Sequence, residues 1–434
     1  MSTARTRGLL LPVGISPEPI VYTLRQLQPE FVAMVATPRS QQKLEEVFQA
    51  HPMPPHRVRI ETVEDSPQNI GLLILVVYEL YRWLTRHCEV KHEEIAVDPT
   101  PARKWMSAGV TMLASQLGLE MVYVDVQFDQ NRKAIPDSMK LIRLGNAFEQ
   151  TGFLAADRGR QHFNRGQFAA AAEAWESIWP ARAQERLLYQ GLAQLARTLH
   201  RWDLFEHYQQ SLRSQFHQAL ELLQSYCRGT VGSDDLLQFV QQMEELAQAV
   251  EKITTAEKPA IQATADLLAN ARRRMAQGQY DDACARLYRA LESVAQFILH
   301  DQYQLDVSRP DWENHEPIRQ AATEAFGDSL PEQLALNNAW VLLWVLNDPV
   351  ARSIVFPNKK DKTRRFHFKF QPLLDRRNNS ILAHGWNAVT KTDVSNLARE
   401  VQQALTANQP ALAQWLEKLQ VPRLPELPLT RPDA

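Results

Sequence analysis

The sequence is poor in the residues that build disulfide frameworks, metal clusters and nucleotide-binding loops. It has three isolated cysteines in 434 residues, Cys88, Cys227 and Cys284, with no CxxC spacing. Isolated cysteines of this kind argue against a structural zinc site and favour a reducing, cytoplasmic location. Neither GxGxxG nor GxxxxGK(S/T) occurs, which argues against a standard dinucleotide or Walker phosphate site.

The sequence also lacks an excess of either charge and long apolar runs. The net charge of -2 argues against a generally basic nucleic-acid-binding protein but permits a local basic patch. The apolar residues 8–12 are too few for a secretory signal. Residues 70–84 are interrupted by Glu79 and Arg82 and are shorter than a membrane span, so we expect a buried helix and no membrane partner.

The first region, residues 1–152, alternates β-branched runs with helical patterns. This alternation predicts a Rossmann-like α/β domain with a mostly parallel sheet. Strands are expected at residues 9–13, 31–36, 57–62, 94–97, 121–125 and 139–143. After the first strand, Gly14 permits a tight turn, Ser16 suits an N-cap and Pro17 suits the first helical position.

Two loops of this domain are candidates for ligand binding. In parallel sheets, ligands bind beyond the carboxyl ends of the strands, where helix N-termini favour anions. Residues 14–18 follow the first expected strand and residues 98–106 follow the fourth. The second loop places Thr100, Arg103 and Lys104 within five residues, which favours phosphate recognition. An ordinary solvated loop is the alternative reading.

The rest of the chain has helical patterns, so all-α regions are expected. We predict a helical connecting domain at residues 153–260, a further helical domain at 261–421 and a disordered, proline-containing tail at 422–434. Residues 166–171 and 278–283 share a glycine, a glutamine, an aromatic residue and an alanine three positions later. Two such turns predict helical hairpins rather than a repeat array.

A basic segment lies near the end of the chain. Between Arg352 and Arg377 there are nine cationic side chains and two aspartates, with phenylalanines at positions 356, 366, 368 and 370. Such a segment suits single-stranded nucleic acid, through phosphate pairing and base stacking. Its RNA-binding candidates are Arg364, Arg365, Lys369 and Arg376. A solvated face, or a short strand carrying the alternating phenylalanines, would explain the same pattern.

Arg377 is the last residue of this segment, and His384 follows it seven residues later. On a helix the two side chains would share one face, with about 20° of drift. An imidazole can transfer protons and a neighbouring cation can stabilise a phosphorane, which together suit RNA cleavage without a metal. Arg376 would lie about 80° away from the histidine's face. The spacing alone also fits an ordinary exposed helix.

These motifs together resemble the CRISPR-associated ribonucleases that join a CARF sensor domain to a HEPN nuclease domain in type III systems. The resemblance covers essentially the whole chain and is strongest at residues 13–19, 98–106 and 377–385. It implies a cyclic oligoadenylate activator, bound at the interface of a homodimer. Ser16, Thr100 and Lys104 match the ligand-binding positions of the family, and Gly14 and Arg103 are further ligand-binding candidates. Arg377 and His384 match the catalytic pair of the nuclease, with Asn378 as the polar neighbour.

The resemblance implies an allosterically activated, metal-independent endoribonuclease that leaves 2′,3′-cyclic phosphate ends on single-stranded RNA. No metal cofactor is expected. One departure is Pro101-Ala102-Arg103, where the family commonly has Gly-Gly-Thr. Two other functions stay open. The chain could be a non-catalytic protein that senses cyclic oligonucleotides, or a ring nuclease that degrades its own activator, which the altered loop makes less favourable.

Overall fold

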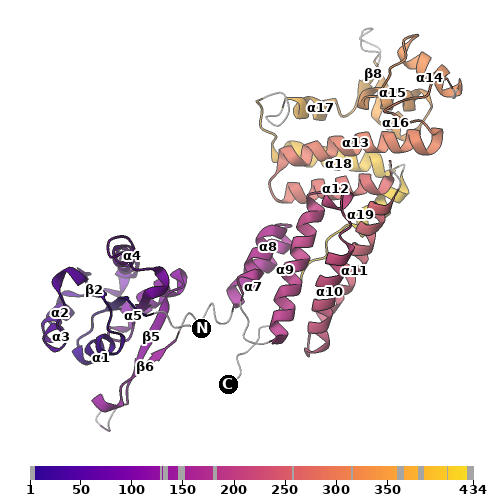
Figure 1. Ribbon diagram of the computed structural model, residues 1–434. Coiled ribbons are helices and arrows are strands. Elements are labelled where there is room, and N and C mark those ends of the chain that lie inside the picture. The colour runs from indigo at the N-terminus through magenta and orange to yellow at the C-terminus, as the bar shows by residue number, and fades with distance from the viewer. Residues whose placement is uncertain are drawn as a thin grey trace. The chain divides into compact units, whose positions relative to one another are not determined.

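The protein folds into two compact units that divide between Phe153 and Leu154. The computed structural model (Figure 1) describes residues 5–127, 130, 135–144, 152–178, 183–256, 259–313, 316–358, 366–379, 386–407 and 409–427. The first unit contains a sheet with helices and the second is almost entirely helical.

The sheet of the first unit has the order β3-β2-β1-β4-β5-β6. Strands β1 to β5 pair in parallel, and β6 is antiparallel to β5. Each strand lies within one residue of the bounds expected from the sequence, and the predicted Rossmann-like fold is confirmed. The strands are β1 (Gly8–Pro12), β2 (Phe31–Ala36), β3 (Val58–Thr62), β4 (Ile95–Val97), β5 (Glu120–Asp125) and β6 (Lys140–Arg143).

Helices cover both faces of this sheet because buried side chains alternate along its strands. Leu10 faces a core built with α4 and α5, whereas Leu9 and Leu11 face a core built with α1 and α3. The helices are α1 (Pro17–Leu27), α2 (Pro38–Gln41), α3 (Leu44–Ala50), α4 (Ile70–Arg86) and α5 (Lys104–Leu117). Short 3-10 turns are η1 (Pro55–Arg57), η2 (Pro67–Asn69), η3 (His92–Glu94) and η4 (Pro136–Ser138).

Helix α4 differs from the buried helix expected at residues 70–84. Leu73 and Val77 are buried, but Leu72 and Leu75 are 52% and 63% exposed. The expected buried helix is therefore buried on one face only, because Leu72 and Leu75 share its outer face with the exposed Glu79. Among the residues that the structure describes, no helix has the length and apolarity needed to cross a membrane.

The second unit packs its helices around one continuous core that extends in sequence from Ala156 to Leu424. Its long helices are α7 (Phe153–Asn164), α8 (Phe168–Glu176), α9 (Ala183–Asp203), α10 (Arg213–Arg228), α11 (Asp234–Thr255), α12 (Ile261–Ala276) and α13 (Tyr280–Tyr303), with η5 (Glu206–Tyr208) after α9. Then follow α14 (Glu316–Phe326), α15 (Leu336–Val345), α16 (Pro349–Ile354), α17 (Gln371–Asn378), α18 (Lys391–Ala407) and α19 (Pro410–Lys418).

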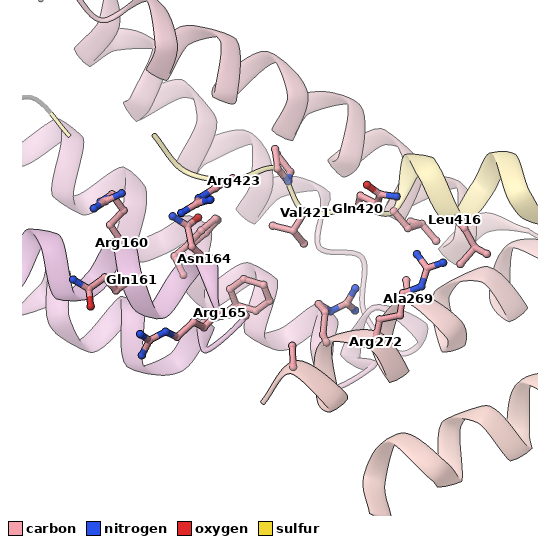
Figure 2. Close-up of a pocket in the computed structure, with 17 residues that line it drawn as sticks. Arg160, Gln161, Asn164, Arg165, Ala269, Arg272, Leu416, Gln420, Val421 and Arg423 are labelled. Carbon is pink, nitrogen blue, oxygen red and sulfur yellow. The ribbon is translucent and has the colours of Figure 1, made fainter. Parts of the chain in front are cut away.

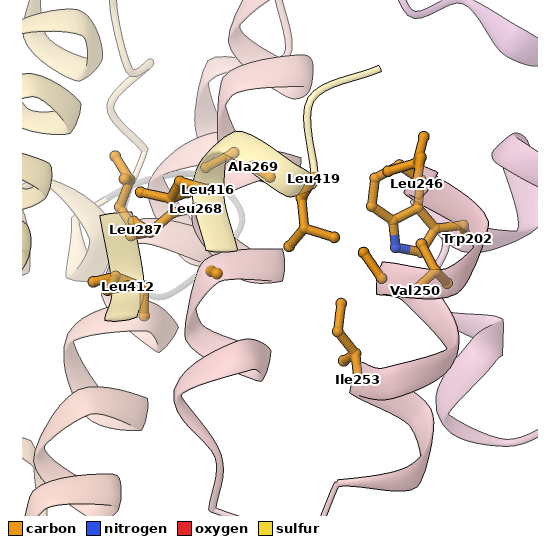
Figure 3. Packing of buried hydrophobic residues seen from close by; sticks show 14 of the residues in the cluster. Trp202, Leu246, Val250, Ile253, Leu268, Ala269, Leu287, Leu412, Leu416 and Leu419 are labelled. Carbon is orange, nitrogen blue, oxygen red and sulfur yellow. The ribbon is translucent and has the colours of Figure 1, made fainter. Parts of the chain in front are cut away.

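The helices on either side of residue 260 share this core instead of forming two separate ones. Figure 3 shows Leu416 and Leu419 packing among side chains from α9, α11 and α12, including Trp202 and Leu246. A buried ion pair adds to this packing, because Asp203 on α9 meets both Arg273 and Arg274 on α12, at 2.7 and 2.8 Å. The boundary expected near residue 260 therefore does not separate independent cores.

The segment after α19 is packed over residues 422–427, contrary to the disorder expected there. Leu424 is 1% exposed. Its N–H donates to Asn164 Oδ1 at 2.8 Å, and its carbonyl accepts from Asn164 Nδ2 at 3.1 Å. The neighbouring prolines remove backbone donors, but Leu424 itself keeps one and buries its side chain. The remainder of the expected tail lies outside the described residues.

Candidate functional site

The two candidate ligand loops of the first unit touch each other. β1 and β4 are neighbours in the sheet, and the connections that follow them lead to opposite sides, to β2 and β5. Their carboxyl ends thus form the switch point at which α/β sheets bind ligands. A Cβ atom at Gly14 would lie 1.6 Å from the carbonyl oxygen of Pro101. Only glycine permits this approach of the two backbones.

Asp98 stabilises the start of the second loop through hydrogen bonds. It is fully buried; its Oδ2 accepts from Thr23 Oγ1 at 2.5 Å and its Oδ1 accepts from the N–H of Thr100 at 2.9 Å. Burial raises the pKa of the Asp98 carboxyl, and the hydrogen bonds from both threonines oppose that rise. Thr100 Oγ1 also accepts from the N–H of Val124 at 3.0 Å, so β5 helps to fix the loop.

Three of the candidate ligand-binding residues lie at the N-termini of two helices. Ser16 is the N-cap of α1 and makes no side-chain capping bond, while Arg103 is the N-cap of α5 and Lys104 its first residue. Ser16 and Lys104 are exposed. The positive ends of two helix dipoles therefore accompany the cation of Lys104, an arrangement that favours an anionic ligand.

Arg103 is already paired in this structure. Its Nη1 lies 2.6 Å from both carboxylate oxygens of Asp65, which follows β3. The arginine side chain is 55% exposed and its partner 28% exposed. No local sequence pattern marks Asp65 as a site residue, because its partner lies 38 residues later in the chain.

The predicted nuclease motif lies only partly within the described residues. Helix α17 contains the backbone of Arg377 and ends at Asn378, whose side chain is exposed. The side chain of Arg377 and the whole of His384 lie outside the described residues. The catalytic roles assigned to these three residues stay predictions.

The predicted helix through residues 377–384 is described only in part. Helix α17 ends at Asn378, and residues 380–385 lie outside the described residues. On the far side of that gap, the N–H of Asn387 donates to the carbonyl of Asn379 at 3.0 Å. The shared helix face of Arg377 and His384 stays a prediction.

A cavity of 590 Å³ lies between α17 and the start of α18. Arg376 forms an ion pair there with Asp393, whose Oδ2 also accepts from Thr390 Oγ1 at 2.6 Å. The hydrogen bond from Thr390, followed by the charge of Arg376, lowers the pKa of the Asp393 carboxyl. Arg376, expected to bind RNA, thus already has a carboxylate partner. The lining residues are Pro372, Asp375, Arg376, Asn379, Asn387, Ala388, Val389, Thr390 and Asp393.

The aromatic side chains of the basic segment mostly serve the core. The strands β7 (Val355–Pro357) and β8 (Phe366–Phe368) pair antiparallel, as the alternative of a short strand anticipated. Phe368 and Phe370 are buried, so they do not present base-stacking surfaces. Lys369 is exposed, with its Nζ 5.7 Å from the Phe370 ring centroid. Arg364 and Arg365 lie outside the described residues.

Two family models match parts of the helical unit. Residues 252–408 match the family model of the Csm6 HEPN domain, and residues 156–207 match a domain of unknown function, DUF309. The fold resembles Enterococcus italicus Csm6 bound to cyclic hexa-2′-fluoro-hexa-dAMP, with a TM-score of 0.52 and 11% identity, covering 96% of this chain and 95% of that one.

A second solved structure is similar over a smaller part. It is Can2 from Sulfobacillus thermosulfidooxidans in complex with cyclic tetra-adenylate, with 14% identity and a TM-score of 0.24, covering 46% of this chain and 67% of that one. The sequence matches none of the curated proteins.

The chain joins a Rossmann-like unit, with paired loops at its switch point, to a helical unit that contains the match to the Csm6 HEPN domain. Two findings agree with the resemblance noted in the sequence: residues 252–408 match the family model of the Csm6 HEPN domain, and the fold of the chain as a whole is similar to that of a Csm6.

Proposed function

We propose that this protein is a metal-independent endoribonuclease that cleaves single-stranded RNA in type III CRISPR defence and is activated by a cyclic oligoadenylate. The match of residues 252–408 to the Csm6 HEPN domain carries the proposal, because this range contains both Arg377 and His384. The paired loops of the first unit support activation by a cyclic oligoadenylate, since they offer a site for an anionic regulator.

His384 would transfer the protons of the cleavage reaction. It would act as a base toward the ribose 2′-hydroxyl or as an acid toward the leaving 5′ oxygen, while Arg377 would stabilise the negative charge of the phosphorane. The 2′-oxygen displaces the 5′ oxygen at phosphorus, so the products are a 2′,3′-cyclic phosphate and a 5′-hydroxyl.

The activator would bind where the loops after β1 and β4 meet. Ser16 and Thr100 offer hydroxyl groups, Lys104 offers a cation, and α1 and α5 direct their N-termini to this edge of the sheet. Arg103 would contribute while it stays paired with Asp65. The contact between Gly14 and Pro101 would set the floor of the site.

A homodimer would place two copies of each site together. An exposed apolar surface on the sensor unit supports this part of the proposal. Leu72 and Leu75 on α4 and Met112 on the neighbouring α5 are 52%, 63% and 58% exposed. Large apolar side chains exposed on two helices that pack together are a feature of protein–protein contact surfaces.

The function can be tested with labelled single-stranded RNA and purified protein, in the presence of cyclic tetra- or hexa-adenylate. Wild type should cleave RNA, and His384→Ala should lower the rate by about 10²- to 10⁴-fold, because a proton-transfer group is lost. The variant should keep its thermal stability and its affinity for the activator. Mass spectrometry of the wild-type products should find cyclic phosphate ends.

Equal cleavage by wild type and His384→Ala would exclude the nuclease assignment. Loss of the cyclic oligoadenylate with intact RNA would instead identify a ring nuclease. Loss of neither molecule would leave a non-catalytic sensor.

A further inference from the structure

A second cavity, of 640 Å³, lies within the helical unit (Figure 2). It is formed by three segments: α7 with the turn that follows it, the C-terminal part of α12, and the end of α19 with the segment after it. It shares no lining residue with the cavity beside α17. None of the residues predicted from the sequence to bind ligand or RNA lines it.

Hydrogen bonds between distant segments fix the walls of this cavity. Asn164 holds the C-terminal segment through its two bonds to Leu424. Gln277 Nε2 donates to the carbonyl of Gly166 at 2.7 Å, so the two glycine-containing turns noted in the sequence meet here. Gly166 has a φ of +73°, which favours glycine at this position. The cavity is therefore a defined part of the fold.

Five arginines line the cavity, and two of them have carboxylate partners. Arg160 pairs with Asp157 at 2.8 Å, and Arg273 pairs with Asp203. The other three come from three different segments, as Figure 2 shows, and within the described part of the chain none of them has a carboxylate partner. These three are Arg165, Arg272 and Arg423.

Arg272 is the least hydrated of these three. Its guanidinium is partly buried and donates to Gln402 Oε1 on α18, with Nε at 3.2 Å. A neutral amide satisfies its hydrogen bonds but does not balance its charge, and burial lowers the pKa of the guanidinium. A partly desolvated cation without a counter-charge is unfavourable until an anion joins it.

We infer that this cavity binds a nucleotide that carries more than one phosphate group. Arg165, Arg272 and Arg423 would hold the phosphates, since guanidinium groups pair well with phosphate oxygens. Val421 and Pro422, which are partly exposed, supply an apolar wall for the nucleoside. The volume lies within the range of about 300–1,000 Å³ that small-molecule sites occupy. This site is additional to the RNA and cyclic oligoadenylate sites of the proposed function.

Isothermal titration calorimetry of the full chain with ATP tests this inference. We expect one saturable site per chain whose affinity falls as salt is added. Arg272→Gln should raise the Kd at least about tenfold, because it removes a charge-assisted contact. The double variant Arg165→Gln/Arg423→Gln should do the same. Both of its side chains are exposed, so it should keep the melting temperature of wild type.

The matched control is Arg319→Gln, which removes an exposed arginine from α14 of the same unit. It should change the Kd less than about twofold, because the lost charge lies outside the cavity. Arg272→Lys should retain part of the affinity, which separates loss of charge from loss of folding. Absence of ATP binding, or equal weakening by Arg319→Gln and the double variant, would overturn the inference.

Discussion

The two units hold their candidate sites in different ways. In the sheet unit, the order of the parallel strands brings distant residues together: Gly14 packs against Pro101, and Asp98 binds Thr23 and Thr100. In the helical unit, no strand pairing sets the partners of α7, α9 and α12. Polar side chains join these segments instead: Asn164 binds Leu424, 260 residues away, and Asp203 pairs with Arg273.

The largest change in stability is expected when the buried carboxylate that joins α9 to α12 is removed. Asp203→Ala leaves Arg273 without its carboxylate partner and Arg274 with only Asp282, at 3.5 Å, so the unfolding free energy of the helical unit should fall by about 3–5 kcal/mol. Urea denaturation followed by circular dichroism measures this change. The transition of the sheet unit should not move.

Glu176→Ala is the control for that experiment. It breaks the pair with Arg197, in which both side chains are exposed, at 41% and 56%. Its cost should stay below about 1 kcal/mol. Equal destabilisation by Asp203→Ala and Glu176→Ala would remove the distinction between a buried network and a surface pair.

A smaller effect is expected in the sheet unit from Gly14→Ala. Its new Cβ would meet a backbone carbonyl that cannot rotate away, so we expect a loss of about 1–3 kcal/mol and weaker binding of cyclic oligoadenylate. Gly71→Ala is the matched control, because nothing lies within 4 Å of its Cβ. It should be neutral or stabilise α4 by up to about 1 kcal/mol. A neutral Gly14→Ala would contradict the close approach of the loops.

The smallest effect should appear as a pH dependence. Because the pKa of Asp98 is raised, the folded state keeps this proton to a higher pH than the unfolded chain does. The stability gained from it is complete below the ordinary carboxyl pKa of about 4 and is lost as the pH rises through the raised pKa. The side chain of Asp98→Asn cannot titrate. The melting temperature of this variant, relative to that of wild type, should therefore rise between pH 4 and pH 7. A constant difference would contradict the burial argument.

The sequence predicted the sheet unit well. Alternating apolar runs marked all six strands to within one residue. The rule that parallel strands share their carboxyl ends then placed residues 14–18 beside residues 98–106. Asp65 was missed, because its partnership with Arg103 depends on the order of the strands rather than on a local pattern.

The helical unit was predicted less well, for a physical reason. Helical periodicity shows which face is apolar but not which helix covers it. The expected tail at Leu424 is therefore packed against α7, and the phenylalanines expected at an RNA surface are core residues at positions 368 and 370. The prediction that Arg377 and His384 share a helix face stays untested, because His384 lies outside the described residues.

The central claim is that the loop pair of the sheet unit controls RNA cleavage at Arg377 and His384. The most direct test is the initial rate of RNA cleavage as a function of cyclic oligoadenylate concentration, for wild type and Lys104→Gln. We expect wild type to be activated at least about tenfold. Lys104→Gln should need at least about tenfold more activator to reach a similar maximal rate, because it loses a charged contact. A wild-type cleavage rate that is independent of the cyclic oligoadenylate would contradict this account.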